Sequence, residues 1–183
     1  MSEEYLVRNC APTLAGLKTG SLFTCPCPDR KATVHFVQQL NRRLRPKGLL
    51  LLPLRFSRQK ALLYLFRPGK LKRDLSQDKA KTLLLCHGYE IGNCEKCVAR
   101  LIQKLRQTED FPHEIGLFLG YPPEDVHGFI CLGPDLCKCC GCWKVYGDEE
   151  AAQKKFAQFK HCTSVYCRRW AETGNLDRLT VAG

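Results

Sequence analysis

The 183-residue sequence contains no apolar run long enough to cross a membrane. Its longest run, Gly48 to Leu54, is interrupted by Pro53, whereas a spanning helix needs about 18 to 20 residues. The N-terminal segment MSEEYLVRNC also lacks the basic region and the apolar stretch of a secretory signal peptide. We therefore expect a cytoplasmic protein without a membrane span.

Internal repeats, low-complexity tracts and long linkers are also missing from the sequence. Hydrophobic residues make up 44% of the chain and charged residues 26%, a balance that is typical of a folded globular protein and excludes general disorder. We therefore expect residues 1–183 to form a single domain, because this length suits one hydrophobic core.

Acidic residues are missing from the stretch between Lys31 and Arg73, which contains twelve Lys and Arg residues and no Asp or Glu. Residues 1–30 carry no net charge and residues 74–183 carry a net charge of −1, so this stretch accounts for all of the excess positive charge. A basic block attracts phosphates, an acidic protein or an anionic membrane surface, and a solvated basic face is the plain alternative. No RNA-recognition, zinc-finger or helix-turn-helix signature supports nucleic-acid binding.

The pattern of apolar residues predicts an α/β fold, with α+β as the alternative. In this fold a mixed sheet of about five strands, including one hairpin, is flanked by four to five helices. Helices are expected over residues 32–45, 70–87, 93–105 and 148–172, and strands over residues 49–56, 61–67, 115–119, 142–146 and 176–181. Pro53 indicates an edge strand or a bulge, and Gly88, Asn93 and Asp148 have the residue types of helix caps.

The thirteen cysteines do not indicate a disulfide framework, because the cytoplasm keeps thiols reduced and the count is odd. The densest group has Cys131 just upstream and could bind zinc or an iron–sulfur cluster as cofactor. This candidate metal site consists of Cys137, Cys139, Cys140 and Cys142. The second knuckle of established zinc patterns is missing there, and Cys25 and Cys27 could complete the site only if the fold brings them near. Cys94 and Cys97 form a CxxC motif that fits either core packing or redox and metal chemistry.

Cys10 precedes Pro12, which would place its thiol at a helix entrance, where a thiolate is favoured. A nucleophilic thiol needs a base, and His113, followed by Glu114, is the most attractive of the five histidines. His87 and His127 could also serve as the base. Three further residues complete the candidate catalytic group by stabilising charge, namely Lys18, Tyr121 and Lys144.

Four segments resemble an uncharacterised family, a domain of unknown function found chiefly in anaerobic Firmicutes. These segments are NCAPTLAGLKTGSLF, FPHEIGLFLGYPPEDVHGFI, GCWKVYGDEEAA and CTSVY. No reaction comes with the resemblance, which implies only that residues within these segments are site candidates. They are Cys10, Pro12, Thr13, Lys18, His113, Glu114, Gly120, Tyr121, Pro122, Asp125, Gly128, Trp143, Lys144 and Tyr146. The chain departs from the family pattern in the number of cysteines between Cys131 and Cys142.

Three functions follow from these features, and whether the protein is an enzyme stays open. The first is a small thiol-dependent enzyme or ligand-binding protein that uses Cys10 with His113 and Glu114 in one pocket. The second is a cysteine-ligated zinc or iron–sulfur protein that works with redox partners. The third is a scaffold or nucleic-acid-binding protein whose basic segment, residues 31–73, contacts an anionic partner.

Overall fold

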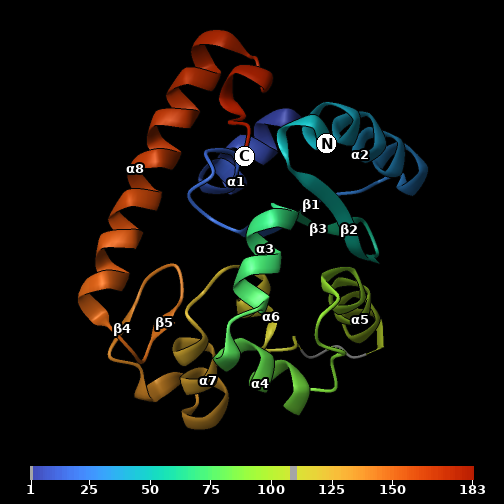
Figure 1. Cartoon of the computed structure of the whole chain (residues 1–183). Coiled ribbons are helices and arrows are strands. Elements are labelled where there is room, and N and C mark those ends of the chain that lie inside the picture. The colour runs from blue at the N-terminus through green and yellow to red at the C-terminus, as the bar shows by residue number, and fades with distance from the viewer. Residues whose placement is uncertain (1, 108–110) are drawn as a thin grey trace. The chain divides into compact units, whose positions relative to one another are not determined.

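The computed structural model describes residues 2–107 and 111–183 (Figure 1). The chain divides into two compact units. Unit 1 consists of Met1–Gly69 and Phe159–Gly183, and unit 2 consists of Lys70–Gln158. None of the helices within the described residues combines the length and the hydrophobicity that crossing a bilayer requires.

Unit 1 contains a three-stranded antiparallel sheet with the order β1-β3-β2. Its strands are β1 (Gly20–Pro26), β2 (Leu50–Ser57) and β3 (Lys60–Phe66). The predicted hairpin between β2 and β3 is confirmed. Pro53 lies in the edge strand β2, where the register shifts between Pro53 and Arg55. An edge position suits proline, because a strand with a partner on one side only can tolerate a missing N–H donor.

The helices of unit 1 are α1 (Glu3–Leu14), α2 (Arg30–Leu44) and the last part of α8 (Glu149–Thr173). Two short 3-10 turns, η1 (Arg45–Lys47) and η3 (Asp177–Leu179), complete it. The expected helix over residues 32–45 is confirmed as α2. Asp29 caps α2 by accepting a hydrogen bond from the backbone N–H of Lys31 at 2.8 Å. Gly48 ends the η1 turn with a φ of 73°, a conformation that favours glycine.

The core of unit 1 lies between these helices and one face of the sheet. The sheet contributes alternate residues such as Leu51, Leu63 and Leu65, because successive side chains of a strand point to opposite faces. Leu6 and Cys10 of α1 pack in the same cluster as Val37, Leu40 and Leu44 of α2. The hydrophobic face of each helix is therefore buried within unit 1.

Unit 2 contains α4 (Asp78–Cys86), α5 (Cys94–Gln107), α6 (Ile115–Phe118), α7 (Pro123–Leu132), the 3-10 turn η2 (Pro134–Leu136), most of α3 (Pro68–Leu75) and the start of α8. A two-stranded antiparallel ribbon joins β4 (Cys139–Cys140) to β5 (Lys144–Val145). Asn93 caps α5 as predicted, since its Oδ1 accepts a hydrogen bond from the N–H of Lys96 at 3.0 Å. Gly88 has the expected positive φ, 74°.

The fold class is confirmed as a mixture of helices and strands, but several expected elements are wrong. The strands form two small antiparallel sheets instead of one mixed sheet of about five strands. The expected strand over residues 115–119 is the single helical turn α6, and the expected strand over 176–181 contains the η3 turn. Short apolar runs do not distinguish a strand from a buried helical turn.

Two expected helices also differ in their bounds. The helix expected over residues 70–87 is divided into α3 and α4, and the hydroxyl of Ser76 donates to the carbonyl of Lys72 at 2.6 Å at the end of the first. The helix expected to begin at Pro12 begins instead at Glu3, so Pro12 lies inside its last turn. Cys10 is therefore in the middle of a helix and not at its entrance.

Candidate functional site: an aromatic pocket in unit 2

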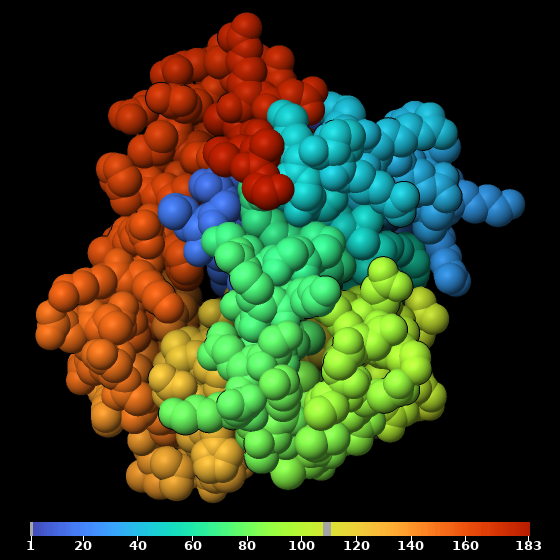
Figure 2. Space-filling model, viewed as in Figure 1, coloured from blue at the N-terminus to red at the C-terminus, as the bar shows by residue number. Residues whose placement is uncertain are grey.

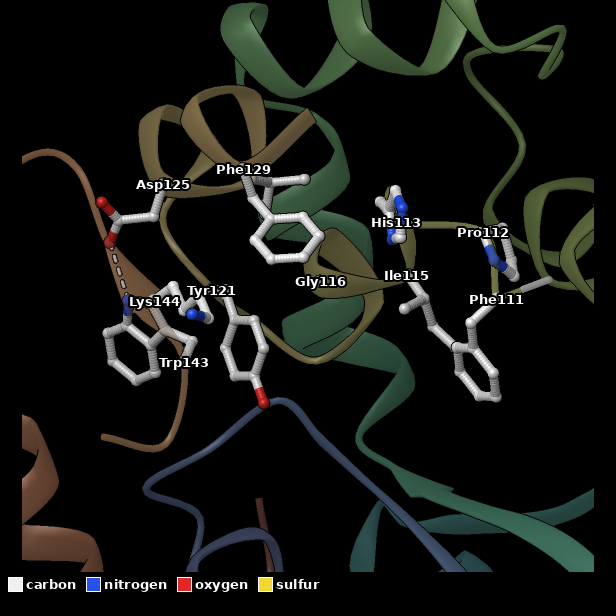
Figure 3. Close-up of a pocket in the computed structure, with 11 residues that line it drawn as sticks. Phe111, Pro112, His113, Ile115, Gly116, Tyr121, Asp125, Phe129, Trp143 and Lys144 are labelled. Atoms are coloured by element: carbon white, nitrogen blue, oxygen red, sulfur yellow. Dashed lines mark hydrogen bonds between the residues drawn. The ribbon is translucent and has the colours of Figure 1, made fainter. Parts of the chain in front are cut away.

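A cavity of about 270 Å³ lies within unit 2 between α6, α7 and β5 (Figure 3). Its walls are mainly aromatic and aliphatic side chains. In Figure 3 the rings of Tyr121 and Phe129 face the side chains of Ile115 and Phe111. The remaining lining residues are Pro112, His113, Gly116, Asp125, Val126, Trp143 and Lys144.

Asp125 of α7 fixes the wall that β5 contributes. Its Oδ2 accepts a hydrogen bond from the indole Nε1–H of Trp143 at 2.7 Å. Its Oδ1 accepts from the backbone N–H groups of Tyr146 at 2.8 Å and Gly147 at 2.7 Å. Asp125 is only 3% exposed, and a buried carboxylate needs such donors to replace its lost hydration. Asp125 therefore holds the segment around Trp143 against α7.

Trp143 is packed between two other rings. The ring of Tyr121 stacks on the indole of Trp143 with ring centroids 5.0 Å apart. The ring of Phe156 lies in an edge-to-face arrangement with the indole, with ring centroids 4.5 Å apart. The hydroxyl of Tyr121 donates to the carbonyl of Cys142 at 3.1 Å. Burial raises the pKa of Tyr121 to about 12, so this hydroxyl stays protonated near neutral pH. The indole is thus a fixed wall of the cavity.

Two glycines allow the elements around the cavity to approach closely. A Cβ atom on Gly116 would lie 2.7 Å from Cγ2 of Val126, and one on Gly128 would lie 2.3 Å from the ring of Tyr146. A larger residue at either position would push α6 or β5 away from α7. Close packing therefore explains Gly116 and Gly128.

His113 and Glu114 point to different surroundings. The imidazole of His113 lines the cavity and meets the ring of Phe129 edge-on, with centroids 4.9 Å apart. Glu114 is 3% exposed, and its Oε1 accepts from Nζ of Lys104 at 2.5 Å and from the hydroxyl of Tyr89 at 3.1 Å. Glu114 forms an ion pair with Lys104. Lys104 therefore competes for the carboxylate with His113, which is the partner that the sequence predicts.

The ion pair fixes the charge state of Glu114. Burial is the largest single influence and raises the pKa of this carboxyl. The hydrogen bond and the charge of Lys104, together with hydrogen bonds from the backbone and from Tyr89, outweigh burial, so the net pKa is lowered. Glu114 is therefore a carboxylate near neutral pH. Glu114 immediately precedes α6, so its bonds to Lys104 and Tyr89 hold the start of this helix, which contributes Ile115 and Gly116 to the cavity.

Cys10 and Lys18 belong to unit 1, whereas the other four candidate catalytic residues belong to unit 2. Cys10 is fully buried, and this burial raises the pKa of its thiol well above the ordinary value, although the charge of Lys18 acts in the opposite direction. A buried thiol in a helix interior does not have the activated character that the sequence pattern indicated. A pairing of Cys10 with His113 stays a prediction.

The candidate metal ligands lie along η2 and the β4–β5 ribbon. Cys139 and Cys140 form β4, while Cys137 precedes it and Cys142 follows it. Among residues 2–107 and 111–183, no three His, Cys, Asp or Glu side chains are grouped closely enough to hold a metal ion. The proposed zinc or iron–sulfur site therefore receives no support from the geometry.

The CxxC motif lies at the start of α5. Burial, followed by the neighbouring Cys97, raises the pKa of Cys94 to about 11, and burial raises the pKa of Cys97 as well. The thiol of Cys97 donates to the carbonyl of Glu90 at 3.2 Å. These surroundings favour packing over redox chemistry for this motif.

Cys131, by contrast, is exposed and lies one helical turn after His127 on α7, with its Sγ 3.4 Å from Nε2 of His127. An imidazole that takes the thiol proton generates the nucleophilic thiolate. We expect a low dose of iodoacetamide near neutral pH to label Cys131 at least about tenfold faster than the buried Cys10. Peptide mapping by mass spectrometry at several time points measures both rates, with His127→Gln as the variant that should slow only Cys131. Labelling of Cys10 first would contradict this expectation.

The sequence pattern singled out several residues of the cavity but missed its main structure. His113, Tyr121 and Lys144 were expected in a pocket and do line the cavity. The roles of Asp125 and Phe129 were missed. The sequence does mark Asp125 and Trp143 as site candidates, since both lie in the segments that carry the family resemblance. It does not indicate their hydrogen bond, because the two residues are 18 positions apart in the chain.

The comparisons with known proteins give a family and no function. A family model described as "Protein of unknown function (DUF3793)" matches residues 6–180. No curated protein and no solved structure matches the chain.

Proposed function

We propose that this chain, which belongs to the DUF3793 family of proteins of unknown function, binds a small planar aromatic molecule with an acidic group. The aromatic pocket of unit 2 is the binding site. The observation that carries the proposal is the composition of its walls, because four aromatic side chains surround one cavity. They are Phe111, Tyr121, Phe129 and Trp143.

The size of the cavity supports a small ligand. At the packing density of protein interiors, about 270 Å³ accommodates a molecule of roughly ten to fifteen non-hydrogen atoms. Cavities for drug-sized ligands begin at about 300 Å³. One or two fused rings with a short polar substituent therefore match the available volume.

The polar groups of the cavity favour an acidic substituent. His113 offers a ring N–H, and Lys144 adds positive charge while its Nζ donates to the carbonyl of Pro134 at 2.8 Å. The carboxylate of Asp125 already accepts three hydrogen bonds from Trp143, Tyr146 and Gly147. Hydrogen-bond donors with positive character therefore outnumber acceptors for a ligand, which favours a carboxylate.

Binding fits the cavity better than thiol catalysis does. Among the described residues that line it there is no serine, threonine or cysteine, so no thiol or aliphatic hydroxyl is at hand as a nucleophile. The thiol-dependent reaction expected from Cys10, and with it the catalytic roles of Lys18, Glu114 and Lys144, stays a hypothesis. The ligand-binding part of that expectation is the one that the geometry supports.

Indole-3-carboxylate tests this function as a probe of the stated chemistry. Isothermal titration calorimetry should give one saturable site on the whole protein, and His113→Ala should weaken binding at least about tenfold, because a charge-assisted hydrogen bond contributes about 1.5 to 3 kcal/mol. The neutral analogue indole-3-carboxamide should bind more weakly than the acid.

His35→Ala is the matched control, because His35 is an exposed histidine of α2 in unit 1. This variant should bind the probe as the unchanged protein does. Val126→Phe adds a second test, since a larger side chain at this lining position fills the cavity and should abolish binding. Equal binding by all variants would show that the probe does not occupy the aromatic pocket.

A further inference from the structure

The net positive charge of the protein lies entirely in unit 1. This unit contains sixteen Lys and Arg residues and five Asp and Glu residues, a balance of +11. Unit 2 contains thirteen of each and is neutral. The sequence placed the excess in residues 31–73, but the three cations at the end of that segment belong to neutral unit 2. They are Lys70, Lys72 and Arg73.

In unit 1 a stripe of exposed polar residues, with cations near both of its ends, runs along one side of α2. Exposed polar residues recur there at intervals of four and three, which places them on one face of a helix. They are Lys31, His35, Gln38, Arg42 and, in the following η1 turn, Arg45. The helix is about 22 Å long at 1.5 Å per residue. Residues of α2 appear light blue to cyan on the surface in Figure 2.

The turn of the β2–β3 hairpin extends this stripe. The backbone N–H of Cys27, just before α2, donates to the carbonyl of Gln59 at 2.7 Å. The guanidinium of Arg30 lies 4.7 Å from the centre of the Phe56 ring. These contacts hold the start of α2 beside the turn that carries the exposed Arg58 and Lys60. We call the exposed cations Arg30, Lys31, Arg42, Arg45, Arg58 and Lys60 the basic face.

The acidic residues of unit 1 are engaged elsewhere. Glu3 and Asp177 both pair with Arg43, which lies off the stripe, and Glu4 pairs with Arg8. Asp29 caps α2, and Glu172 lies near the end of α8. Over the described residues no salt bridge involves a member of the basic face. Its charge is therefore left for an external anion.

We propose that the basic face binds the phosphate backbone of double-stranded nucleic acid, independently of the ligand site in unit 2. Cations at both ends of the rigid helix α2 and in the adjoining hairpin turn can contact several phosphates of one polymer at once. Phe56 is half-buried and covered by Arg30, so the face offers no open aromatic platform on which unstacked bases could lie. A duplex therefore fits it better than a single strand, and the binding is independent of sequence.

Fluorescence anisotropy with a labelled 20-base-pair DNA duplex tests this proposal on the whole protein. We expect binding at 50 mM salt that weakens steeply at 200 mM salt. The variant Lys31→Gln/Arg42→Gln/Arg45→Gln/Lys60→Gln should bind at least about tenfold more weakly, and the slope of log K against log salt should fall by about three to four, or about 0.9 per lost phosphate contact.

The matched control removes four charges from unit 2, with Lys79→Gln/Lys138→Gln/Lys154→Gln/Lys155→Gln. It should bind the duplex like the unchanged protein, and circular dichroism should show that both variants are folded. Equal weakening by the two variants would overturn the proposal, because net charge alone would then explain binding. No binding of the duplex at 50 mM salt, or binding of phosphatidylserine vesicles or polyglutamate in its place, would also overturn it.

Discussion

Replacing Asp125 by Ala is expected to lower the free energy of unfolding by about 3 to 5 kcal/mol. The substitution leaves three donors without their acceptor, namely the buried indole N–H of Trp143 and two partly buried backbone N–H groups. Each such loss costs about 1 to 3 kcal/mol, and the partly buried groups lie at the lower end of this range. Asp125→Asn should cost about half as much, because one amide oxygen can still accept from Tyr146 and Gly147 while its NH₂ group faces Trp143.

Urea unfolding followed by tryptophan fluorescence measures this effect. In a Trp170→Phe background Trp143 alone reports, and it lies in the wall that Asp125 holds. Asp148→Ala is the control, because Asp148 is exposed and caps α8 by accepting from the N–H of Ala151 at 3.0 Å. Loss of this cap should cost about 1 kcal/mol. A midpoint for Asp125→Ala no lower than that of the control would show that Asp125 does not organise the pocket.

Arg67→Lys is expected to destabilise unit 1 by about 2 to 4 kcal/mol. Arg67 is 3% exposed, and its guanidinium donates to the carbonyls of Thr13, Leu14 and Val181 at 2.7 to 2.8 Å. Burial lowers the pKa of Arg67, which shows the cost of placing this charge inside the unit. The shorter, point-like ammonium of Lys cannot reach all three oxygens at once.

Thermal unfolding followed by circular dichroism tests this prediction, with an expected fall in Tm of roughly 5 to 15 °C. Arg43→Lys is the control. Arg43 also joins two segments, because it pairs with Glu3 and Asp177, but 40% of its side chain is exposed to solvent. An exposed pair contributes less than about 1 kcal/mol. Similar melting temperatures for the two variants would mean that Arg67 does not join α1 to the C-terminal segment.

Local signals predicted the regular elements well. The stripe of apolar residues and the cap at Asn93 predicted α5, and the two apolar runs around residues 57–60 predicted the β2–β3 hairpin. In both cases the residues that decide the structure lie within a few positions of one another. Pro53 likewise indicated an edge strand with a bulge, which the register shift beside it confirms.

The errors arose where tertiary packing decides the local structure. Residues 115–119 are apolar enough for a buried strand, but residues 115–118 form the helical turn α6, in which Gly116 packs closely against Val126 of α7. The cysteine-rich loop indicated a metal site because its thiols are close in sequence, yet only Cys139 and Cys140 lie in β4, and within the described residues no three potential ligands are grouped closely enough to hold a metal ion. Sequence spacing alone could not show either arrangement.

Local signals in the sequence identified only part of the pocket. His113 and Tyr121 could be singled out because an imidazole and a phenol stand beside turns, where binding residues are common. The arrangement around Asp125 depends on hydrogen bonds to residues 18 to 22 positions later in the chain. Such contacts leave no periodic pattern in the sequence.

The two tryptophans offer the most direct test of the ligand site. Trp143 lines the cavity of unit 2, whereas Trp170 packs against the core of unit 1. A ¹⁵N–¹H correlation spectrum contains one indole N–H signal for each, and Trp170→Phe assigns them. Titration with indole-3-carboxylate should shift the Trp143 signal in a saturable manner and leave the Trp170 signal in place. A Trp143 signal that does not move, or two signals that drift together without saturation, would contradict the proposal that the aromatic pocket binds a small aromatic acid.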